Sequence, residues 1–183
     1  MRFESCEVIL EDFFFLKIVI MELDEHHFPY MTKQEIDDEK SLWLEEIKME
    51  YAFKLLTGIE AEIRQEFRQS ISSKHRDPLS KGFNSLCDEY RQQKGDYLKS
   101  RRELCKKIRL SGILECLVRF YKAAQDSFHS KCSILKGHFS FRNWYAHGRY
   151  QYPVAVPDPE DIIDIYDNLK QQVFDRTYRS LHQ

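Results

Sequence analysis

Residues 138–152, with the sequence HFSFRNWYAHGRYQY, are the stretch that is most informative about the fold and function of the chain. The segment from Phe128 to Ala146 has a helix-compatible pattern of apolar and polar residues and contains no proline. Gly148 follows shortly after, and a glycine in this place commonly ends a helix because it adopts the left-handed conformation without a Cβ clash. The pattern therefore predicts a helix that carries Arg142 near its end and His147 in its last turn.

The residue types in this helix suit the cleavage of phosphodiesters. Arg142 offers a fork of donors to a phosphate, and His147 can give and take protons near neutral pH. The helix dipole also favours a cation at this end, by roughly 0.3–1 kcal/mol. Because RNA carries its own nucleophile, the ribose 2′-OH, these two side chains are sufficient in principle without a metal. The spacing alone is common, so a structural arginine followed by a capping histidine is the alternative.

The string FRNWYAHGRY, residues 141–150, resembles the signature of HEPN domains, in the branch of stand-alone bacterial proteins near the RiboL-PSP-HEPN type. Residues 51–63, YAFKLLTGIEAEI, resemble the opening long helix of that branch. The resemblance implies an all-α fold, an HEPN-like helical bundle with long antiparallel helices that forms a homodimer. It also implies a metal-independent endoribonuclease that acts on an RNA substrate and needs no cofactor.

In the implied mechanism, Arg142 and His147 of both copies line one dimeric cleft. His147 acts as general base or general acid, and Arg142 neutralises charge on the phosphate. Asn143 orients His147 or contacts ribose, and its alternative is to cap or bridge helices. The alternative function is a non-catalytic HEPN-like dimer that binds RNA or a partner protein. A more distant option is a helical adaptor whose acidic amino-terminal third is the partner surface.

Many members of the family are toxins of toxin–antitoxin or phage-defence systems, so we expect a nucleotidyltransferase or another antitoxin protein as a partner. The nucleotidyltransferase modifies a tyrosine two residues after the histidine. In this chain Arg149 occupies that position and Tyr150 comes one residue later, which speaks against control by this modification. The departure leaves the cleavage chemistry unaffected.

Length and composition indicate one helical domain over residues 1–183, with residues 1–31 either in the bundle or an appended element. Hydrophobic residues make up 42% of the chain, which is ample for a core, and six glycines and five prolines suit helices. No apolar run is long enough to span a membrane, and no secretory signal is present. Five widely spaced cysteines indicate reduced thiols and a cytoplasmic protein. Cys132 lacks a second pair of ligands with zinc spacing, so no metal site is expected.

The net charge of −2 conceals an uneven distribution of charged residues. The first fifty residues are acidic, whereas residues 91–122 are mainly basic. Such a segment can follow a phosphate backbone, although a solvated helix face is the alternative. We expect RNA contacts from the basic run and from the residues after His147, namely Arg101, Arg102, Lys106, Lys107, Arg149 and Tyr150.

The remaining pattern predicts further helices, with loops between them. Apolar spacing favours helices over residues 4–23, 41–69, 83–97 and 110–124, although the first of these also suits a pair of strands. Residues 70–82 are predicted to form a loop, and Gly58 marks a kink or a close helix contact. Asp158 and Pro159 are a typical helix start, and they predict a final helix to about Arg179.

Overall fold

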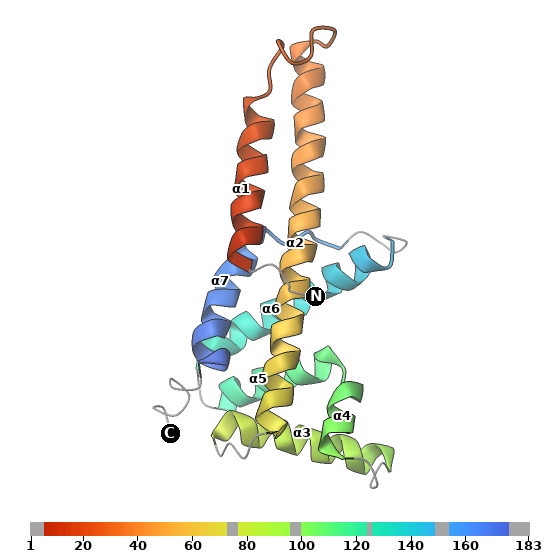
Figure 1. The fold of residues 1–183 in the computed structure, drawn as a ribbon, viewed down its shortest axis with the longest axis vertical. Helices are drawn as coiled ribbons and strands as arrows, with labels where there is room; N and C mark the ends of the chain where they lie inside the picture. The colour runs from red at the N-terminus through yellow and green to blue at the C-terminus, as the bar shows by residue number, and fades with distance from the viewer. Residues whose placement is uncertain (1–5, 73–76, 96–99, 124–125, 149–153, 176–183) are drawn as a thin grey trace. The chain divides into compact units, whose positions relative to one another are not determined.

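The described part of the chain is entirely helical (Figure 1). The structure is a computed structural model, and it describes residues 6–72, 77–95, 100–123, 126–148 and 154–175, in which there is no strand. The helices are α1 (Cys6–Glu22), α2 (Lys33–Ser72), α3 (Pro78–Lys94), α4 (Arg101–Lys107), α5 (Leu110–Ala123), α6 (Phe128–Ala146), α7 (Pro159–Leu169) and the π-helical turn η1 (Lys170–Phe174). The prediction of an all-α fold is therefore confirmed.

The chain divides into two compact units, each built from separate stretches of sequence. The first unit comprises Met1–Gly58 and His138–Ile163, and the second comprises Ile59–Gly137 and Asp164–Gln183. Helices α2, α6 and α7 each contribute residues to both units. The single-domain assignment stays a prediction.

In the first unit, α1 packs against the amino-terminal part of α2. The buried residues of α1 recur at helical spacing and form its inner face: Cys6, Ile9, Phe13 and Ile20. The rings of Phe13 and Tyr51 lie 5.7 Å apart between centroids. A Cβ atom on Gly58 would lie 3.4 Å from Sγ of Cys6, so the predicted close helix contact at this glycine is confirmed. The helical interpretation of residues 4–23 is also confirmed over Cys6–Glu22, and residues 4 and 5 lie outside the described residues.

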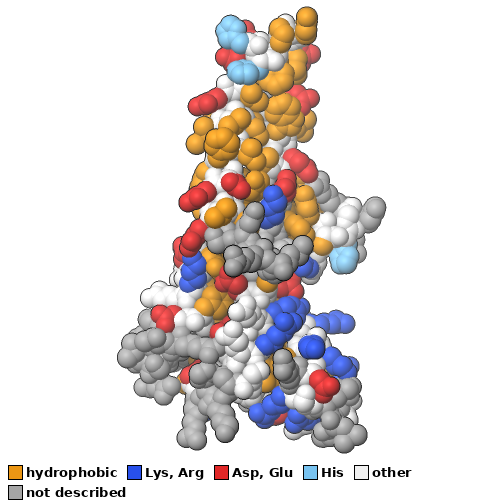
Figure 2. Space-filling model, viewed as in Figure 1, with side chains coloured by type: hydrophobic (Ala, Val, Ile, Leu, Met, Phe, Trp, Pro, Cys, Tyr) orange, Lys and Arg blue, Asp and Glu red, His pale blue; other side chains and the backbone are white. Residues whose placement is uncertain are grey.

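The outer face of α1 is apolar as well. Figure 2 shows hydrophobic side chains along this helical hairpin, and those of α1 that are exposed are Val8, Phe14, Phe15, Ile18, Val19 and Met21. The exposed side of α1 also carries carboxylates, among them Glu7, Glu11 and Asp12. None of the helices in the described ranges combines the length and the apolar character needed to cross a bilayer.

Helix α2 begins eight residues before the predicted start at Ser41. Thr32 and Glu35 form reciprocal bonds at its amino terminus: Thr32 N–H donates to Glu35 Oε2 at 2.7 Å, and Glu35 N–H donates to Thr32 Oγ1 at 3.3 Å. This capping box satisfies donors that the first helical turn leaves open. The prediction was wrong because the acidic run from Asp37 to Lys40 was assigned to the lead-in, whereas it lies inside the helix.

In the second unit, the end of α2 packs with α3, α4, α5 and the first part of α6. Phe67 and Phe83 meet edge to face at 5.1 Å between ring centroids, and both side chains are fully buried. Gly82 permits a close approach, because a Cβ atom there would lie 3.7 Å from Sγ of Cys116. Tyr121 of α5 donates its hydroxyl to the carbonyl of Gln172 at 2.8 Å.

The predicted loop over residues 70–82 is wrong at both ends. Helix α2 continues to Ser72, and α3 already begins at Pro78. Asp77 caps α3 by accepting a hydrogen bond from Ser80 N–H at 3.0 Å, and Pro78 suits the first turn because it lacks an N–H. Helix α3 ends at Lys94, before the predicted end at residue 97, and Gly95 caps it with a left-handed φ of 65°.

The last described helix starts as predicted and ends differently. The Oδ1 atom of Asp158 accepts a hydrogen bond from Glu160 N–H at 3.0 Å, which confirms the predicted start of α7. The helix changes at Lys170 into the π-helical turn η1, and Asp175 N–H bonds to the carbonyl of Lys170 at 2.8 Å. The predicted end at Arg179 lies outside the described residues.

Candidate functional site

Helix α6 carries the arginine and histidine of the motif, and both of its ends are defined by specific contacts. At its start, Asp126 accepts a hydrogen bond from Phe128 N–H at 2.8 Å. At its end, Gly148 has a φ of 81° and donates its N–H to the carbonyl of Tyr145 at 3.2 Å. The predicted glycine stop is therefore confirmed, and it fixes where the backbone leaves the helix beside His147.

Asn143 contacts the two other predicted catalytic residues. Its side-chain Oδ1 accepts a hydrogen bond from Nη1 of Arg142 at 3.2 Å, and its carbonyl accepts the N–H of His147 at 3.1 Å. Arg142 is half-buried, whereas the side chains of Asn143 and His147 are exposed. The amide of Asn143 thus holds the guanidinium rather than the imidazole. His147 lies one residue beyond α6 but keeps a helical backbone bond.

Aromatic side chains anchor this end of α6 inside the first unit. Phe141 is fully buried, and its ring lies 6.0 Å from Trp144 and 5.8 Å from Tyr145 between centroids. Tyr145 also meets Phe53 of α2 at 5.0 Å. Phe141 is buried and the half-buried rings of Trp144 and Tyr145 pack against it, so aromatic contacts support the turn that carries Arg142 and His147.

The spacing of Arg142 and His147 separates them around the helix. An α-helix turns about 100° per residue, so five residues place the two side chains about 140° apart. Asn143 and His147, four residues apart, lie on one face. A phosphate held by both Arg142 and His147 therefore has to reach around the helix end, or the two groups have to come from two chains.

His138 is a third titratable group in this part of α6. Its burial and a nearby carboxylate determine which protonation state is favoured. Burial lowers the pKa of His138, and the negative charge of Asp161 opposes that effect. Its Nε2 atom is buried and has no hydrogen-bond partner in the part of the chain that the structure describes. These surroundings favour the neutral imidazole.

The predicted RNA-binding residues of the basic run differ in what they contact. Ser100 and Glu103 form a capping box that starts α4. The guanidinium of Arg101 bonds to Asp88 at 2.8 Å and to Oδ1 of Asn84 at 2.9 Å. Lys106 and Lys107 are exposed on the last turn of α4. Arg102 also lies in α4, and the structure does not describe its side chain. Arg149 and Tyr150 fall outside the described residues.

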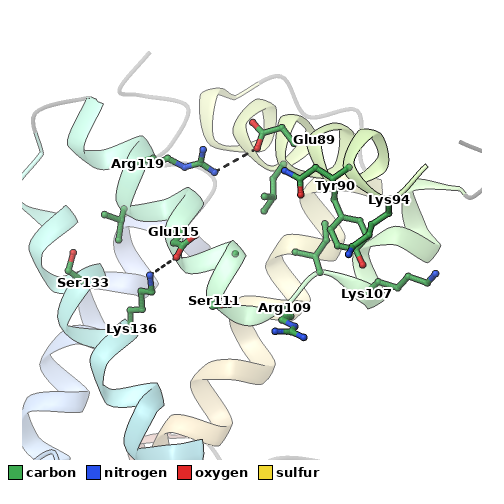
Figure 3. Close-up of a pocket in the computed structure, with 15 residues that line it drawn as sticks. Glu89, Tyr90, Lys94, Lys107, Arg109, Ser111, Glu115, Arg119, Ser133 and Lys136 are labelled. Carbon is green, nitrogen blue, oxygen red and sulfur yellow. Dashed lines mark hydrogen bonds and ion pairs between the residues drawn. The ribbon is translucent and has the colours of Figure 1, made fainter. Parts of the chain in front are cut away.

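A large groove lies in the second unit, between α3, the junction of α4 and α5, α5 and α6 (Figure 3). We call it the basic groove. It has a volume of about 1090 Å³, and two glutamates and five cationic residues line it: Lys94, Lys107, Arg109, Arg119 and Lys136. Of the predicted RNA-binding residues that are described in full, Lys107 lines the groove, whereas Arg101 and Lys106 do not.

Tyr90 and Lys136 are among the lining residues that were not singled out from the sequence. Tyr90 is half-buried on the face of α3 that also carries Leu86, Glu89, Gln93 and Lys94. This i, i+3, i+4, i+7 and i+8 spacing is a signal that marks one face of a helix. Lys136 comes from α6, and only the tertiary fold brings it to the groove.

The described residues contain no group of three histidine, cysteine or acidic side chains that could hold a metal ion. All five cysteines are buried and form no disulfide. The side chains of Arg142, Asn143 and His147 supply a guanidinium, an amide and an imidazole at the motif.

No protein-family model matches the chain, and no curated protein or solved structure is detectably similar to it.

Proposed function

We propose that the protein is a metal-independent endoribonuclease of HEPN type. The observation that carries the proposal is the arrangement at the end of α6, where Asn143 contacts Arg142 through its side chain and His147 through its carbonyl. A positive guanidinium and an exposed imidazole beside a solvent-facing helix end are the groups that RNA transesterification requires. The resemblance of residues 141–150 to HEPN domains supports the same chemistry.

In the proposed reaction the 2′-oxygen of ribose attacks the adjacent phosphorus atom. One His147 removes the 2′-OH proton, and the bond from phosphorus to the 5′-oxygen breaks. A protonated imidazole, from His147 of a second copy, gives its proton to the leaving 5′-oxygen. The products are a 2′,3′-cyclic phosphate and a 5′-hydroxyl, and Arg142 stabilises the negative charge that develops on the phosphate oxygens.

A homodimer is part of the proposal, and the geometry of α6 supports it. Because Arg142 and His147 point about 140° apart on one helix, a composite site made from two chains brings the two groups onto one phosphate more easily than a single chain does. Mixing a wild-type chain with an excess of the Arg142→Ala/His147→Ala double variant tests this directly. Because the proposed reaction uses His147 of both copies, we expect the mixed dimer to be inactive and the rate per wild-type chain to fall. An unchanged rate per wild-type chain in a sample that contains mixed dimers would rule out a composite site.

The experiment that tests the ribonuclease itself is cleavage of labelled RNA in the presence of EDTA. Wild type is expected to cut, and His147→Ala and Arg142→Ala are expected to lose at least about a hundredfold in rate. His26→Ala and Arg68→Ala, which change exposed residues of the same types, are the matched controls and should retain full rate. Cleavage that persists in His147→Ala, or that EDTA abolishes, would contradict the proposal.

A toxin role is part of the proposal. Expression of wild type alone should arrest growth, and His147→Ala should not. A nucleotidyltransferase or another protein encoded beside the chain is the expected antitoxin. Growth arrest that is equal in wild type and His147→Ala would separate toxicity from the proposed chemistry.

The second candidate is a non-catalytic helical module that binds a partner protein. It is favoured by the exposed apolar outer face of α1, which includes Phe15 and Ile18 at 65% and 55% exposure. The surrounding residues 6–50 carry thirteen carboxylates against four lysines, a charge that suits a basic partner. Inactivity of wild type on all RNA tested, together with a partner complex that Phe15→Ser abolishes, would favour this function.

A further inference from the structure

We propose that the basic groove of the second unit binds the backbone and bases of single-stranded RNA, as an element separate from the residues that carry out cleavage. This inference rests on the proposed function for the choice of RNA as the ligand. It adds a binding site that includes Tyr90, Lys94 and Arg109, none of which belongs to the motif of α6. The groove would supply affinity, and the motif would supply chemistry.

The charges of the groove are only partly neutralised from within. Lys136 pairs with Glu115 at 2.5 Å, and Arg119 lies 3.9 Å from Glu89. These pairs account for both acids that line the groove. Lys94 and Arg109 form no ion pair with the part of the chain that the structure describes, and both side chains are exposed. An excess of positive charge therefore remains at the groove and favours an anionic ligand.

Lys94 and Arg109 lie on the same side of the groove as Tyr90. Figure 3 shows the two ion pairs on one side and Lys94, Arg109 and Tyr90 on the other. Figure 2 shows lysine and arginine side chains clustered on the surface of the second unit. Several phosphates in succession fit such a row of cations better than one isolated phosphate does.

The lining also contains apolar and aromatic surface. Leu86, Ile108 and Val118 contribute aliphatic groups, and Tyr90 contributes a half-buried ring between the cations of α3 and the α4–α5 junction. A positively charged groove with an aromatic ring is the usual site for single strands, because every unpaired base has a face that can stack. A duplex keeps those faces stacked inside, so it gains only the charge contacts.

The size of the groove agrees with a polymer. Sites for small ligands enclose about 300–1,000 Å³, and this groove reaches about 1090 Å³. Its residues come from four helices and the short connection between α4 and α5, so the surface extends across the unit.

The test measures binding without cleavage. A fluorescent 2′-O-methyl oligonucleotide about 12 nucleotides long lacks the nucleophile, and its anisotropy is recorded with the full chain between about 50 and 200 mM salt. Lys94→Ala/Arg109→Ala should weaken binding about tenfold and reduce the salt slope by about 1.4, or 0.7 for each lost phosphate contact. The matched control is Lys81→Ala/Lys122→Ala, which removes two exposed lysines of α3 and α5 outside the groove and should leave both quantities unchanged.

Tyr90 tests the contribution of stacking separately from charge. Tyr90→Leu should weaken binding at least about fivefold, and Tyr90→Phe should keep it, because only the ring is required. Thermal melts of each variant establish that the second unit is folded. Equal affinities for Lys94→Ala/Arg109→Ala and its control would overturn the proposal. So would polyglutamate or an RNA duplex that competes as well as the single strand.

Binding and cleavage measurements together distinguish an incorrect groove proposal from an incorrect ribonuclease proposal. If His147→Ala binds the oligonucleotide as wild type does but wild type never cleaves RNA, the groove stands and the ribonuclease does not. If wild type cleaves RNA while the groove variants bind and cleave normally, the ribonuclease stands and the groove proposal falls.

Discussion

Replacing Gly148 by alanine should destabilise the protein and reduce RNA cleavage beyond the loss of folded protein. The φ of Gly148 is 81°, a left-handed conformation that a Cβ atom disfavours by about 1–2 kcal/mol. The Gly148→Ala chain can respond to the substitution in two ways. It can accept this strain, or it can continue α6 and lose the bond from Gly148 N–H to the carbonyl of Tyr145, which measures 3.2 Å. Continuation would redirect the chain directly after His147.

Gly95 provides the control for this substitution. Its φ is 65°, it ends α3, and a Cβ atom there would meet nothing within 4 Å. Gly95→Ala therefore imposes the same kind of backbone strain in the second unit without touching the motif. Both variants should lower the free energy of unfolding by about 1–2 kcal/mol in urea titrations, or about 2–8 °C in melting temperature. Gly148→Asn should lose less, because asparagine tolerates left-handed backbone better.

The activity measurement separates strain from positioning. At a temperature where all variants are fully folded, Gly95→Ala should cleave RNA at the wild-type rate and Gly148→Ala should cleave more slowly. Gly148→Ala that is as stable as wild type would refute the role of this glycine as the helix stop. Equal cleavage by the two variants would show that the position of His147 does not depend on how α6 ends.

Three further predictions concern stability and thiol chemistry. Thr32→Ala should destabilise the protein by about 1 kcal/mol in urea titrations, because it removes the capping box of α2. Burial lowers the pKa of His138, so the stability gained from its neutral form is present above the unfolded pKa of about 6.5 and is lost as pH falls below it. His138→Gln should flatten that fall, as measured by urea midpoints from about pH 7 to 5, and an unchanged profile would exclude His138 as its source. A hydrogen bond from the Cys87 thiol lowers the pKa of Cys105 to about 7, so iodoacetamide should modify Cys105 before the other buried thiols in peptide mapping, and labelling of Cys132 first would contradict this.

Local signals in the sequence predict most helices, and the errors have physical causes. The stop at Gly148 and the start at Asp158 follow from backbone rules that act within a few residues, and both are confirmed. The start of α2 was missed although Thr32 and Glu35 carry a capping-box pattern, because the carboxylates that follow suggested a solvated connection. Pro78 was taken as part of a loop, whereas after the capping residue Asp77 a proline starts a helix.

In the candidate site, too, some features follow from neighbouring residues in the sequence, whereas others depend on the tertiary fold. The placement of Arg142, Asn143 and His147 at one helix end depends on neighbours in sequence and was predicted. The contact from Arg142 to Asn143 Oδ1 was not predicted, because rotamers at a helix end are set by packing around them. Tyr90 and Lys136 come to one groove from α3 and α6, which no short pattern connects.

The charge that is available to an RNA depends on which cations are already paired within the protein. Arg101 belongs to the most basic run of the chain, yet its guanidinium bonds to Asp88 and Asn84, so any phosphate would have to compete with a carboxylate at 2.8 Å. Lys94 and Arg109 belong to the same basic segment, residues 91–122, and neither has an acidic partner in the described residues. Because of this internal pairing, we expect Lys94 and Arg109 to contribute more to RNA binding than Arg101 does. A count of lysines and arginines along the sequence suggests the opposite order. The same reasoning explains how a chain of net charge −2 can present a phosphate-binding groove, since affinity for a polyanion depends on the cations left over where the ligand sits.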